Sequence, residues 1–530
     1  MNTHAHRLHT QREKAIAQLQ RKQQSEGLSD AEKDRLIERL LGENQFLKEQ
    51  MALAKQKLFA SKSEAFPGQG ELFNEPEAIQ DTATESGDTD DDDSIEYTVK
   101  RKKRNTQRFD DHLEREVVIH DIDEDEKVCG CCQGQMHCIG KEVTEKLEFV
   151  PATAKVIEHH RLKYACRGCE NDETRTPIKI APPVPAILPK SYATPSLLAQ
   201  IITSKYQHGL PLYRQEVIFK QLGIQLSRQT MSDWLIKIAM LFKPIFYDPW
   251  HATLLQQDYV RADETTLKVV NEDKHTCYMW VYNCGTDTPE GKIQGDTTPN
   301  IVLYDYQPSR AGQCAVNFLG DYKGYLSVDG YAGYGQTQAR LVACLAHIRR
   351  KFMEAKKAQG KQSKTGKADW ALSHIQKLYR IEQQIKGSSI EVRYQTRQEK
   401  SLPLLNQFKI WLDKSISQVL PESLLGKAID YALNQWNNFI RYCEDGRIDV
   451  DNNRSERAIK PFVIGRKAWL MSQTANGAQA SAILYSVIET AKANGLKPYD
   501  YLMDVMQKMV DGETDTAQLS PWKQVCSSND

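Results

Sequence analysis

Two pairs of cysteines, each pair separated by two residues, place the strongest constraint on how this chain of 530 residues folds. The four side chains are Cys129, Cys132, Cys166 and Cys169. Four thiolates from two such pairs close a tetrahedron around Zn²⁺, and a small domain built on them needs the metal to fold. Buried free thiols explain the paired spacing poorly, so we predict a structural zinc ion in a domain spanning residues 111–180. Competing ligands in this stretch are Cys131, Cys138, His159 and His160.

The rest of the composition favours a soluble, cytoplasmic protein. A content of 12 cysteines in a long intracellular chain argues against a disulfide framework. The first fourteen residues are polar and lack the apolar core of a signal peptide. No uninterrupted apolar stretch approaches the ~18 residues that a membrane span requires.

Charge is distributed unevenly along the chain. There are 70 basic and 70 acidic residues, but ten carboxylates and no Lys or Arg lie between Glu75 and Glu96. The rest of the chain therefore carries an excess of ten positive charges. A basic body can bind polyanions, although ordinary solvated surface explains the charge equally well. Residues 67–110, where the acidic run precedes a basic pentad, are predicted to be a disordered linker.

Residues 1–66 contain a heptad pattern typical of a coiled coil. Position a falls on Ile37, Asn44, Met51 and Leu58, and position d falls on Leu40, Leu47 and Ala54. Asn at one a position favours a two-stranded parallel pair in fixed register, which predicts a homodimer. The alternative is a single amphipathic helix that packs on its own protein.

Residues 181–245 are predicted to form a helical region. Helical patterns cover Pro195–Tyr206 and Leu212–Leu222, and Ser227 is placed to cap a third helix. Two short helices joined by a glycine turn fit a helix-turn-helix, whose reading end would carry Arg228, Gln229 and Ser232. Helix pairs of this shape also occur without a DNA role, so shape alone leaves both interpretations open.

Beyond residue 258 the pattern changes to short apolar strands. Strands in a row, and then a strand followed by a helix, fit a mixed sheet flanked by helices. Asp263 and Asp329 each come directly after a strand, so both are expected at strand ends that can converge on one site. The expected strands are Tyr259–Ala262, Thr276–Tyr282, Ile301–Tyr306, Gly324–Val328 and Leu341–Leu345, with a helix at Ala346–Lys357.

A third carboxylate, Glu456, lies in a segment with a helical pattern. On a helix, Asn452, Asn453 and Lys460 share its face, a polar stripe of a kind found at phosphate and metal sites. The alternative is a capping box, in which Glu456 bonds back to the backbone near Asn453. Three carboxylates from distant positions can hold two hard divalent cations, which prefer oxygen ligands. The residue pattern alone favours neither a catalytic role nor a capping role for Glu456.

Several segments together resemble the transposases of the insertion-sequence 66 family, of the TnpC type. The likeness covers nearly the whole chain in the same order, with small departures such as Lys460-Pro461 where Arg-Pro is more usual. The matching segments, besides the cysteine pairs, are Lys62-Ser63-Glu64, Pro189-Lys190-Ser191, Lys205-Tyr206, Leu210–Arg214, Ala262–Thr265, Asp329-Gly330-Tyr331, Ala346–Phe352, Asp451-Asn452-Asn453 with Glu456-Arg457, and Gly465–Trp469.

This resemblance implies a multidomain α+β protein. Its parts would be an N-terminal coiled coil, a zinc-binding module, a helical helix-turn-helix-like region and a ribonuclease H-like α/β catalytic domain. The catalytic domain would occupy residues 246–366 and 441–490, separated by a helical insertion at 367–440. A C-terminal helical region would follow at 491–530.

The resemblance also implies a DDE transposase that cuts and joins DNA, with Asp263, Asp329 and Glu456 as a triad that binds two Mg²⁺ or Mn²⁺ ions. Its partners would be the element's terminal inverted repeats, target DNA and accessory proteins of the element, and on DNA it would associate with the nucleoid. The side chains expected against DNA, with a solvated helix surface as the alternative, are Arg228, Gln229, His347, Arg349, Arg350, Lys351, Arg457, Arg466 and Lys467.

Two other functions are considered beside this one. A non-catalytic DNA-binding regulator would keep the zinc and zipper modules but tolerate the loss of a carboxylate, and here all three carboxylates are present. A metal-dependent nuclease without strand joining is the second alternative.

Overall fold

The computed structural model describes residues 153–165, 178–274, 276–359 and 366–522, together with residues 115–119 and single positions before residue 147. Two units are distinguished by their internal contacts: residues 62–153 form one, and residues 1–61 with 154–530 form the other. The strands and helices named below belong to the second unit. Among the described residues, none of the helices is long and apolar enough to cross a membrane.

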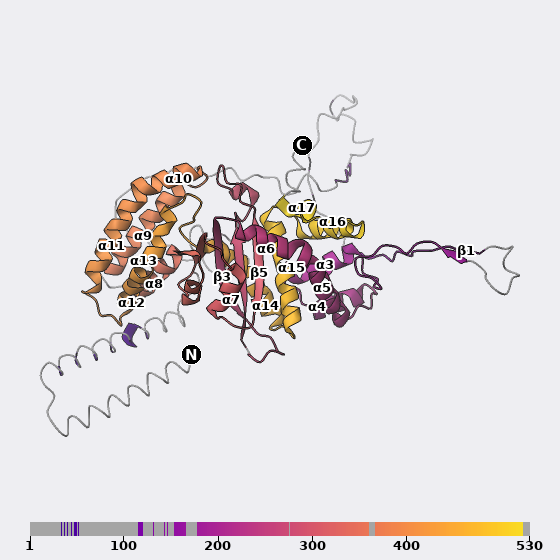
Figure 1. The fold of residues 1–530 in the computed structure, drawn as a ribbon, viewed down its shortest axis with the longest axis horizontal. Helices are drawn as coiled ribbons and strands as arrows, with labels where there is room; N and C mark the ends of the chain where they lie inside the picture. The colour runs from indigo at the N-terminus through magenta and orange to yellow at the C-terminus, as the bar shows by residue number, and fades with distance from the viewer. Residues whose placement is uncertain are drawn as a thin grey trace, which may run out of the picture. The chain divides into compact units, whose positions relative to one another are not determined.

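A five-stranded mixed sheet lies at the centre of this unit (Figure 1). The strand order is β5-β4-β3-β6-β7; β4 is antiparallel to both its neighbours, whereas β6 is parallel to β3 and to β7. Apolar and aromatic residues form these strands, and β4 is buried on both faces from Met279 to Cys284. The strands are β3 Tyr259–Leu267, β4 Cys277–Cys284, β5 Ile301–Gln307, β6 Tyr325–Val328 and β7 Arg340–Ala343.

The expectation that the first strand ends before Asp263 is wrong, since β3 continues to Leu267. Its pairing with β4 is unbroken there, from Asp263 opposite Val281 to Leu267 opposite Cys277. β6 pairs with β3 only as far as Arg261, so Asp263 lies where the parallel side of the strand becomes free. Pairing with β4 determines where β3 ends, and the polar segment Glu264–Thr266 gives no local sign of that pairing.

The edge strand β5 is covered by helix α15 (Ala475–Ala493), which is buried along most of its length. Two outward N–H groups of β5 donate to hydroxyls of this helix: Val302 to Thr490 at 3.0 Å, and Tyr304 to Ser486 at 2.8 Å. An uncovered edge would expose these groups for pairing with another strand. The helix therefore ends the sheet and fixes β5 in register.

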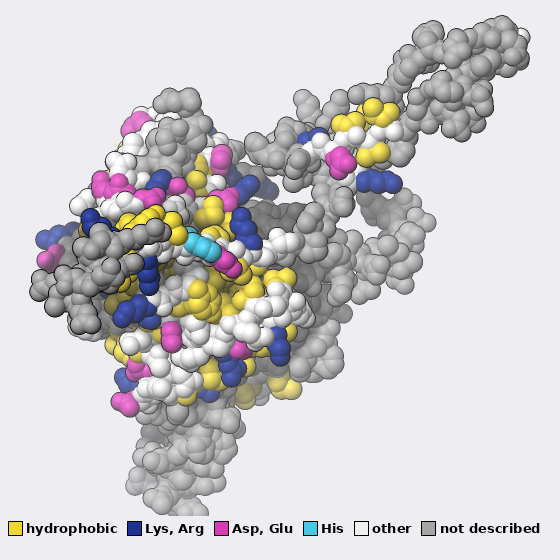
Figure 2. Space-filling view, turned by 90° about the vertical axis from the view of Figure 1, so that its right-hand side faces the viewer, with side chains coloured by type: hydrophobic (Ala, Val, Ile, Leu, Met, Phe, Trp, Pro, Cys, Tyr) yellow, Lys and Arg dark blue, Asp and Glu magenta, His cyan; other side chains and the backbone are white. Residues whose placement is uncertain are grey.

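The predicted helices before the sheet are present with small shifts. Helix α3 covers Pro195–Tyr206, α4 covers Leu212–Gln221 and α5 covers Arg228–Phe242. Ser227 caps α5 by accepting from the Thr230 N–H at 3.1 Å, as the sequence predicts. Basic, acidic and apolar side chains are interspersed on the face of the molecule that Figure 2 shows. A π-helical turn at Lys243–Tyr247 and helix α6 (Asp248–Leu255) then lead into β3.

A helical region with its own core follows β7. Helix α8 contacts α9 and α12, and this region has a core of buried residues distinct from the one around most of the sheet. Arg397, fully buried here, donates to Glu382 and to the carbonyls of Tyr442 and Asp445. The helices are α8 Leu345–Gln359, α9 Lys367–Gln384, α10 Ile390–Thr396, α11 Leu402–Ile416, α12 Leu424–Asn434 and α13 Trp436–Phe439.

The chain then returns to the sheet through helix α14 (Asn453–Trp469), which contacts β3 and β4. Pro461 lies inside α14, whose backbone hydrogen bonds continue to the C-cap residue Leu470. The remaining elements are β1 Lys163–Ala165, β2 Ile178–Ile180, α7 Gly312–Leu319, α16 Pro498–Val510 and α17 Thr516–Leu519.

Candidate active site

Asp263 and Asp329 come to the same edge of the sheet. Strands β3 and β6 are parallel neighbours in which Arg261 lies opposite Ser327. Two residues further along each strand, the register brings Asp263 level with Asp329, which directly follows β6. The parallel pairing therefore places together two carboxylates that are far apart in the sequence.

Glu456 reaches this edge from the first turn of α14. Asn452, which precedes the helix and is almost completely buried, donates its amide to the Ala262 carbonyl at 2.8 Å. Asn283 on β4 donates to the Ser455 hydroxyl at 2.8 Å. These bonds hold the start of α14 against the strand that carries Asp263.

The capping interpretation of Glu456 is wrong. The helix begins one residue earlier than a capping box requires, with Asn452 as its N-cap and no side-chain capping bond. The Glu456 Oε1 atom is buried and makes no hydrogen bond to the described residues. Its carboxylate is therefore free of the local structural role that the sequence allowed.

The three carboxylates interact electrostatically. Burial, and after it the neighbouring charge of Glu264, raises the pKa of Asp263 to about 7, and the charges of Asp329 and Glu456 contribute to the rise. Such a cluster favours a bound cation, because the positive charge offsets the effect of the neighbouring carboxylates on Asp263.

The donors at this edge fit a hard divalent cation. All three are carboxylates, and Glu456 offers a buried oxygen without a hydrogen-bond donor. Within the described part of the chain, no three His, Cys, Asp or Glu side chains already enclose a single point. Asp263, Asp329 and Glu456 are thus the residues that would hold such an ion, with water and phosphate oxygens completing its shell.

Helix α8 brings two of the predicted DNA-contacting residues to Glu456. The Glu456 Oε1 atom lies 3.7 Å from Nη2 of Arg350 and 3.9 Å from Nε2 of His347. Burial, with the charge of Arg350, lowers the pKa of His347. A neutral imidazole and an exposed guanidinium therefore flank this carboxylate.

Sequence reasoning missed two residues at the site, Glu264 and Arg310. Glu264 follows Asp263 on β3, and its side chain is only 2% exposed. Arg310 precedes α7 and donates from Nε to Glu264 at 2.8 Å, while its Nη2 lies 3.9 Å from Asp329 Oδ2. The motif Ala262–Thr265 included Glu264, but no spacing in the sequence indicated its partner 46 positions away.

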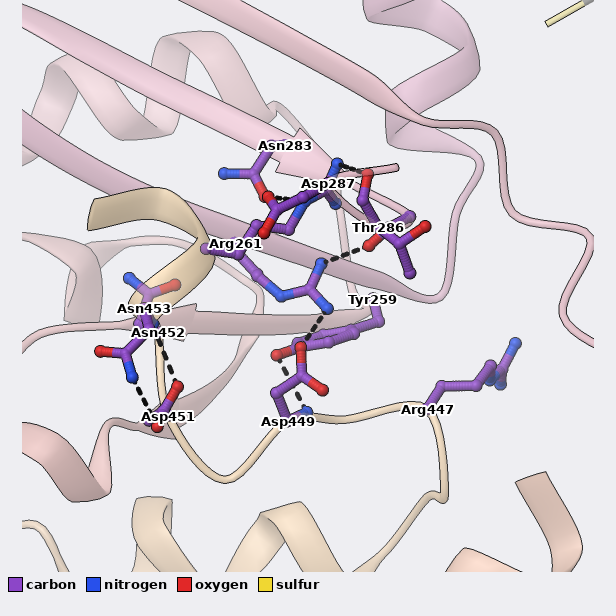
Figure 3. Close-up of polar contacts among 12 residues, drawn as sticks. Tyr259, Arg261, Asn283, Thr286, Asp287, Arg447, Asp449, Asp451, Asn452 and Asn453 are labelled. Atoms are coloured by element: carbon purple, nitrogen blue, oxygen red, sulfur yellow. Dashed lines mark hydrogen bonds and ion pairs between the residues drawn. The ribbon is translucent and has the colours of Figure 1, made fainter. Parts of the chain in front are cut away.

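A buried network supports the loop that leads to α14 (Figure 3). The Arg261 guanidinium donates to Asp449 at 2.5 Å and to the Gly285 carbonyl at 3.1 Å, and it lies 4.2 Å from the Tyr259 ring. Arg393 of the helical region approaches the same carboxylate at 3.5 Å. Burial alone would raise the pKa of Asp449, but these guanidinium groups lower it below its ordinary value. The loop is thereby attached to both the sheet and the helical region.

The other predicted DNA-contacting residues have varied surroundings. Arg466 donates to the hydroxyls of Thr265 and Thr266 on β3, whereas Arg457 pairs with Asp287. The Lys351 ammonium lies 5.9 Å from the Tyr431 ring. Arg228 and Gln229 are exposed at the start of α5, where Gln229 bonds Asp233. Arg349 is on α8 with His347, and Lys467 is in the last turn of α14.

The four predicted zinc ligands, Cys129, Cys132, Cys166 and Cys169, lie outside the described residues. Of the competing ligands, Cys131 is exposed as a free thiol, and His160 bonds Glu158 at 3.2 Å.

Comparison with known proteins gives matches along most of the chain. The model of the "Transposase IS66 family" matches residues 190–480, which include all three carboxylates. A "zinc-finger binding domain of transposase IS66" matches residues 126–170, and an "IS66 C-terminal element" matches residues 486–522. Residues 46–118 match "Transposase C of IS166 homeodomain".

Relatives of similar length occur in Sinorhizobium fredii. The uncharacterized protein y4jD is 35% identical over 427 residues, which cover 78% of this chain and 80% of the relative. The uncharacterized protein y4hP is 33% identical over 447 residues, covering 81% and 78%. The family matches define the class of protein first: the chain is a transposase. It belongs to the IS66 family.

Proposed function

We propose that this chain is a DDE transposase that cleaves insertion-sequence ends and transfers them to target DNA, with Asp263, Asp329 and Glu456 as the catalytic carboxylates. The observation that carries the proposal is that, beyond burial and the charge of Glu264, the charges of Asp329 and Glu456 raise the pKa of Asp263 in a member of a transposase family. Two divalent cations held by these groups, Mg²⁺ or Mn²⁺, would supply activation of the attacking hydroxyl and stabilisation of the leaving oxygen.

The reaction has two steps at one site. Water first attacks a phosphodiester at the element's end, which frees a 3′-hydroxyl and leaves a 5′-phosphate. That hydroxyl then attacks a phosphodiester of the target strand in line, forming one bond while the target's own 3′-oxygen leaves. Arg350, which lies near Glu456, and Arg466, which bonds Thr266 of β3, would contact backbone phosphates of the reacting DNA.

Recognition of the ends is assigned to the parts that precede the sheet. A zinc ion on Cys129, Cys132, Cys166 and Cys169 would fold the module matched by the zinc-finger family. The exposed start of α5, with Arg228 and Gln229, would approach a groove edge. A homodimer is supported by Ile37, Leu40, Leu47 and Met51, which are helical and each more than half exposed.

We assign the catalytic region to the ribonuclease H-like fold. The assignment is supported by three antiparallel strands followed by two parallel ones, with carboxylates on the central strand and its parallel neighbour. The helical insertion at 367–440 is supported by its helices α9 to α13 and by their separate core.

The Asp263→Asn variant tests the chemistry. With labelled end DNA and Mg²⁺, we expect strand transfer to fall at least about a thousandfold, because one cation ligand is lost, while end binding is retained. Asp430→Asn, on the exposed face of α12, serves as the matched control and should retain transfer.

Each alternative function gives a different product. Persistent transfer by Asp263→Asn would contradict the assignment of the triad. Cleaved but unjoined ends from the wild-type protein would indicate a nuclease, and bound but uncut ends would indicate a regulator.

A further inference from the structure

Glu264 is a buried carboxylate with both oxygens occupied. Its Oε1 accepts from Nε of Arg310 at 2.8 Å and from Nη2 at 2.5 Å, and its Oε2 accepts from the Tyr334 hydroxyl at 2.6 Å. Only the carboxylate of this pair is buried, and an ion pair with an exposed partner adds little stability. The cation that Glu264 holds lies 3.9 Å from Asp329, and this placement points to a function for it.

Arg310 is fixed from a second side by Tyr331. The guanidinium lies 4.0 Å from the centre of the Tyr331 ring, and the Tyr331 hydroxyl donates to the Arg310 carbonyl. The Tyr331 N–H in turn donates to Asp329 Oδ1 at 2.8 Å. Stacking and two hydrogen bonds to the same Glu264 oxygen together leave this side chain little rotational freedom.

The fixed guanidinium still has donors to offer. Its side chain is 41% exposed, and Nη2 lies 3.9 Å from Asp329 Oδ2, too far for a hydrogen bond. Nη1 donates to none of the described residues. An exposed cation near Asp329, one of the proposed catalytic carboxylates, is thus oriented before any ligand arrives.

We propose that Arg310 binds a non-bridging oxygen of the DNA phosphodiester on which the carboxylates act. This inference rests on the proposed function and adds the residue that orients the substrate phosphate. Planar guanidinium groups match phosphate geometry, and a donor fixed in advance loses little entropy when it binds. Glu264, Tyr331 and Tyr334 are then positioning residues, which act through Arg310.

A purely structural role for Arg310 predicts different behaviour. If Arg310 only neutralised Glu264 and held the Asp329 turn, its loss would weaken folding and cation affinity and leave the number of DNA phosphate contacts unchanged. The salt dependence of DNA binding counts those contacts, since each neutralised phosphate contributes about 0.9 to the slope of log K against log salt. The slope therefore separates the two roles.

The test uses the full chain with a duplex that carries the element's terminal repeat, in Ca²⁺ and at several salt concentrations. The main variant is Arg310→Gln, and Glu264→Gln/Arg310→Gln removes both charges so that no buried carboxylate is left unpaired. We expect both variants to lower the salt slope by about 0.9. We also expect kcat/KM for strand transfer to fall about 10- to 100-fold, the loss of one charge-assisted hydrogen bond.

Two further variants sharpen the result. Arg340 makes the same kind of contacts at the opposite end of the sheet, with Glu444 at 2.5 Å and the Tyr325 ring at 4.2 Å, so Arg340→Gln is the matched control and should keep the full slope. Arg310→Lys should keep the slope but lose rate, because it retains the charge and loses the planar fork.

An unchanged slope in the double variant, measured on protein with wild-type Mn²⁺ affinity, would overturn the proposal. An equal decrease in the salt slope of DNA binding in Arg340→Gln and Arg310→Gln would also overturn the proposal. Because binding in Ca²⁺ requires no reaction, the slope can support Arg310 even if Asp263→Asn were to retain strand transfer. The failure of one proposal is thereby distinguishable from the failure of the other.

Discussion

At the scale of single residues, the pKa of Asp263 makes stability depend on pH. The carboxyl is protonated below about pH 7 in the folded chain but only below about pH 4 when unfolded. Between these values the folded chain holds a proton that the unfolded chain has released. The contribution of Asp263 to the free energy of unfolding therefore falls as pH rises from 4 to 7 and stays low above that.

Asp263→Asn should consequently stabilise the protein while removing its activity. We expect the gain in unfolding free energy, measured by urea denaturation without divalent cations, to be about 1 to 2 kcal/mol larger at pH 8 than at pH 5. Excess Mg²⁺ should cancel the gain, because the ion binds only the wild-type carboxylate. An equal gain in unfolding free energy at pH 5 and pH 8 would show that ionisation of Asp263 does not cause the pH dependence of stability.

Residue chemistry also explains which residues of the site could be predicted from the sequence. Asp263 and Asp329 stood out because each follows a short apolar segment, and Glu456 stood out through its Asp-Asn-Asn context. Arg310 lies in a turn between β5 and α7, and only the folded sheet brings it to Glu264. A single arginine with no local pattern carries no signal of its tertiary partner.

At the scale of elements, the start of α14 determines where Glu456 lies. Asn452→Ala removes the bond to the Ala262 carbonyl, which is buried, so we expect the free energy of unfolding to fall by about 1–3 kcal/mol. Strand transfer should fall further than stability alone explains, since Glu456 loses its anchor to β3. The measurements are urea denaturation and the rate of transfer at saturating DNA.

Asn434→Ala is the matched control for that variant. Asn434 donates to Asp430 at 3.0 Å near the end of α12, on the exposed side of the helix. We expect its substitution to change the free energy of unfolding by no more than about 0.5 kcal/mol, and the rate of transfer by no more than the corresponding factor. Asn452→Ala with wild-type transfer would mean that the helix start is held by other contacts.

Elements differ in how far the sequence predicts their ends. Helix starts are local, and Ser227 gave the start of α5 correctly because its capping bond lies within three residues. The end of β3 depends on β4, which pairs with it as far as Leu267. Strand ends set by a partner, such as this one, are not encoded nearby.

At the scale of the whole molecule, the mixed sheet and its position before a helical region were predictable, because strand-rich and helix-rich segments alternate along the chain. The way in which α14 returns to β3 was not predictable, since β7 and the helices α8 to α13 intervene between Asp329 and Glu456. Only the resemblance connected Glu456 to the other two carboxylates. The heptad pattern, by contrast, gives a prediction about assembly that needs no knowledge of the sheet.

That prediction concerns Leu47, a d residue that is 53% exposed in the single chain. Leu47→Lys places a charge in the seam of a two-stranded coil, so we expect the sedimentation mass to fall from dimer to monomer at micromolar concentration. Joint transfer of two ends should fall with it, while cleavage of a single end persists. Ile410→Lys is the control, because Ile410 is a 69% exposed residue of α11 outside any heptad. If Leu47→Lys kept the wild-type mass, the apolar seam would have to be covered by the chain's own helices, and pairing of ends would depend on another surface.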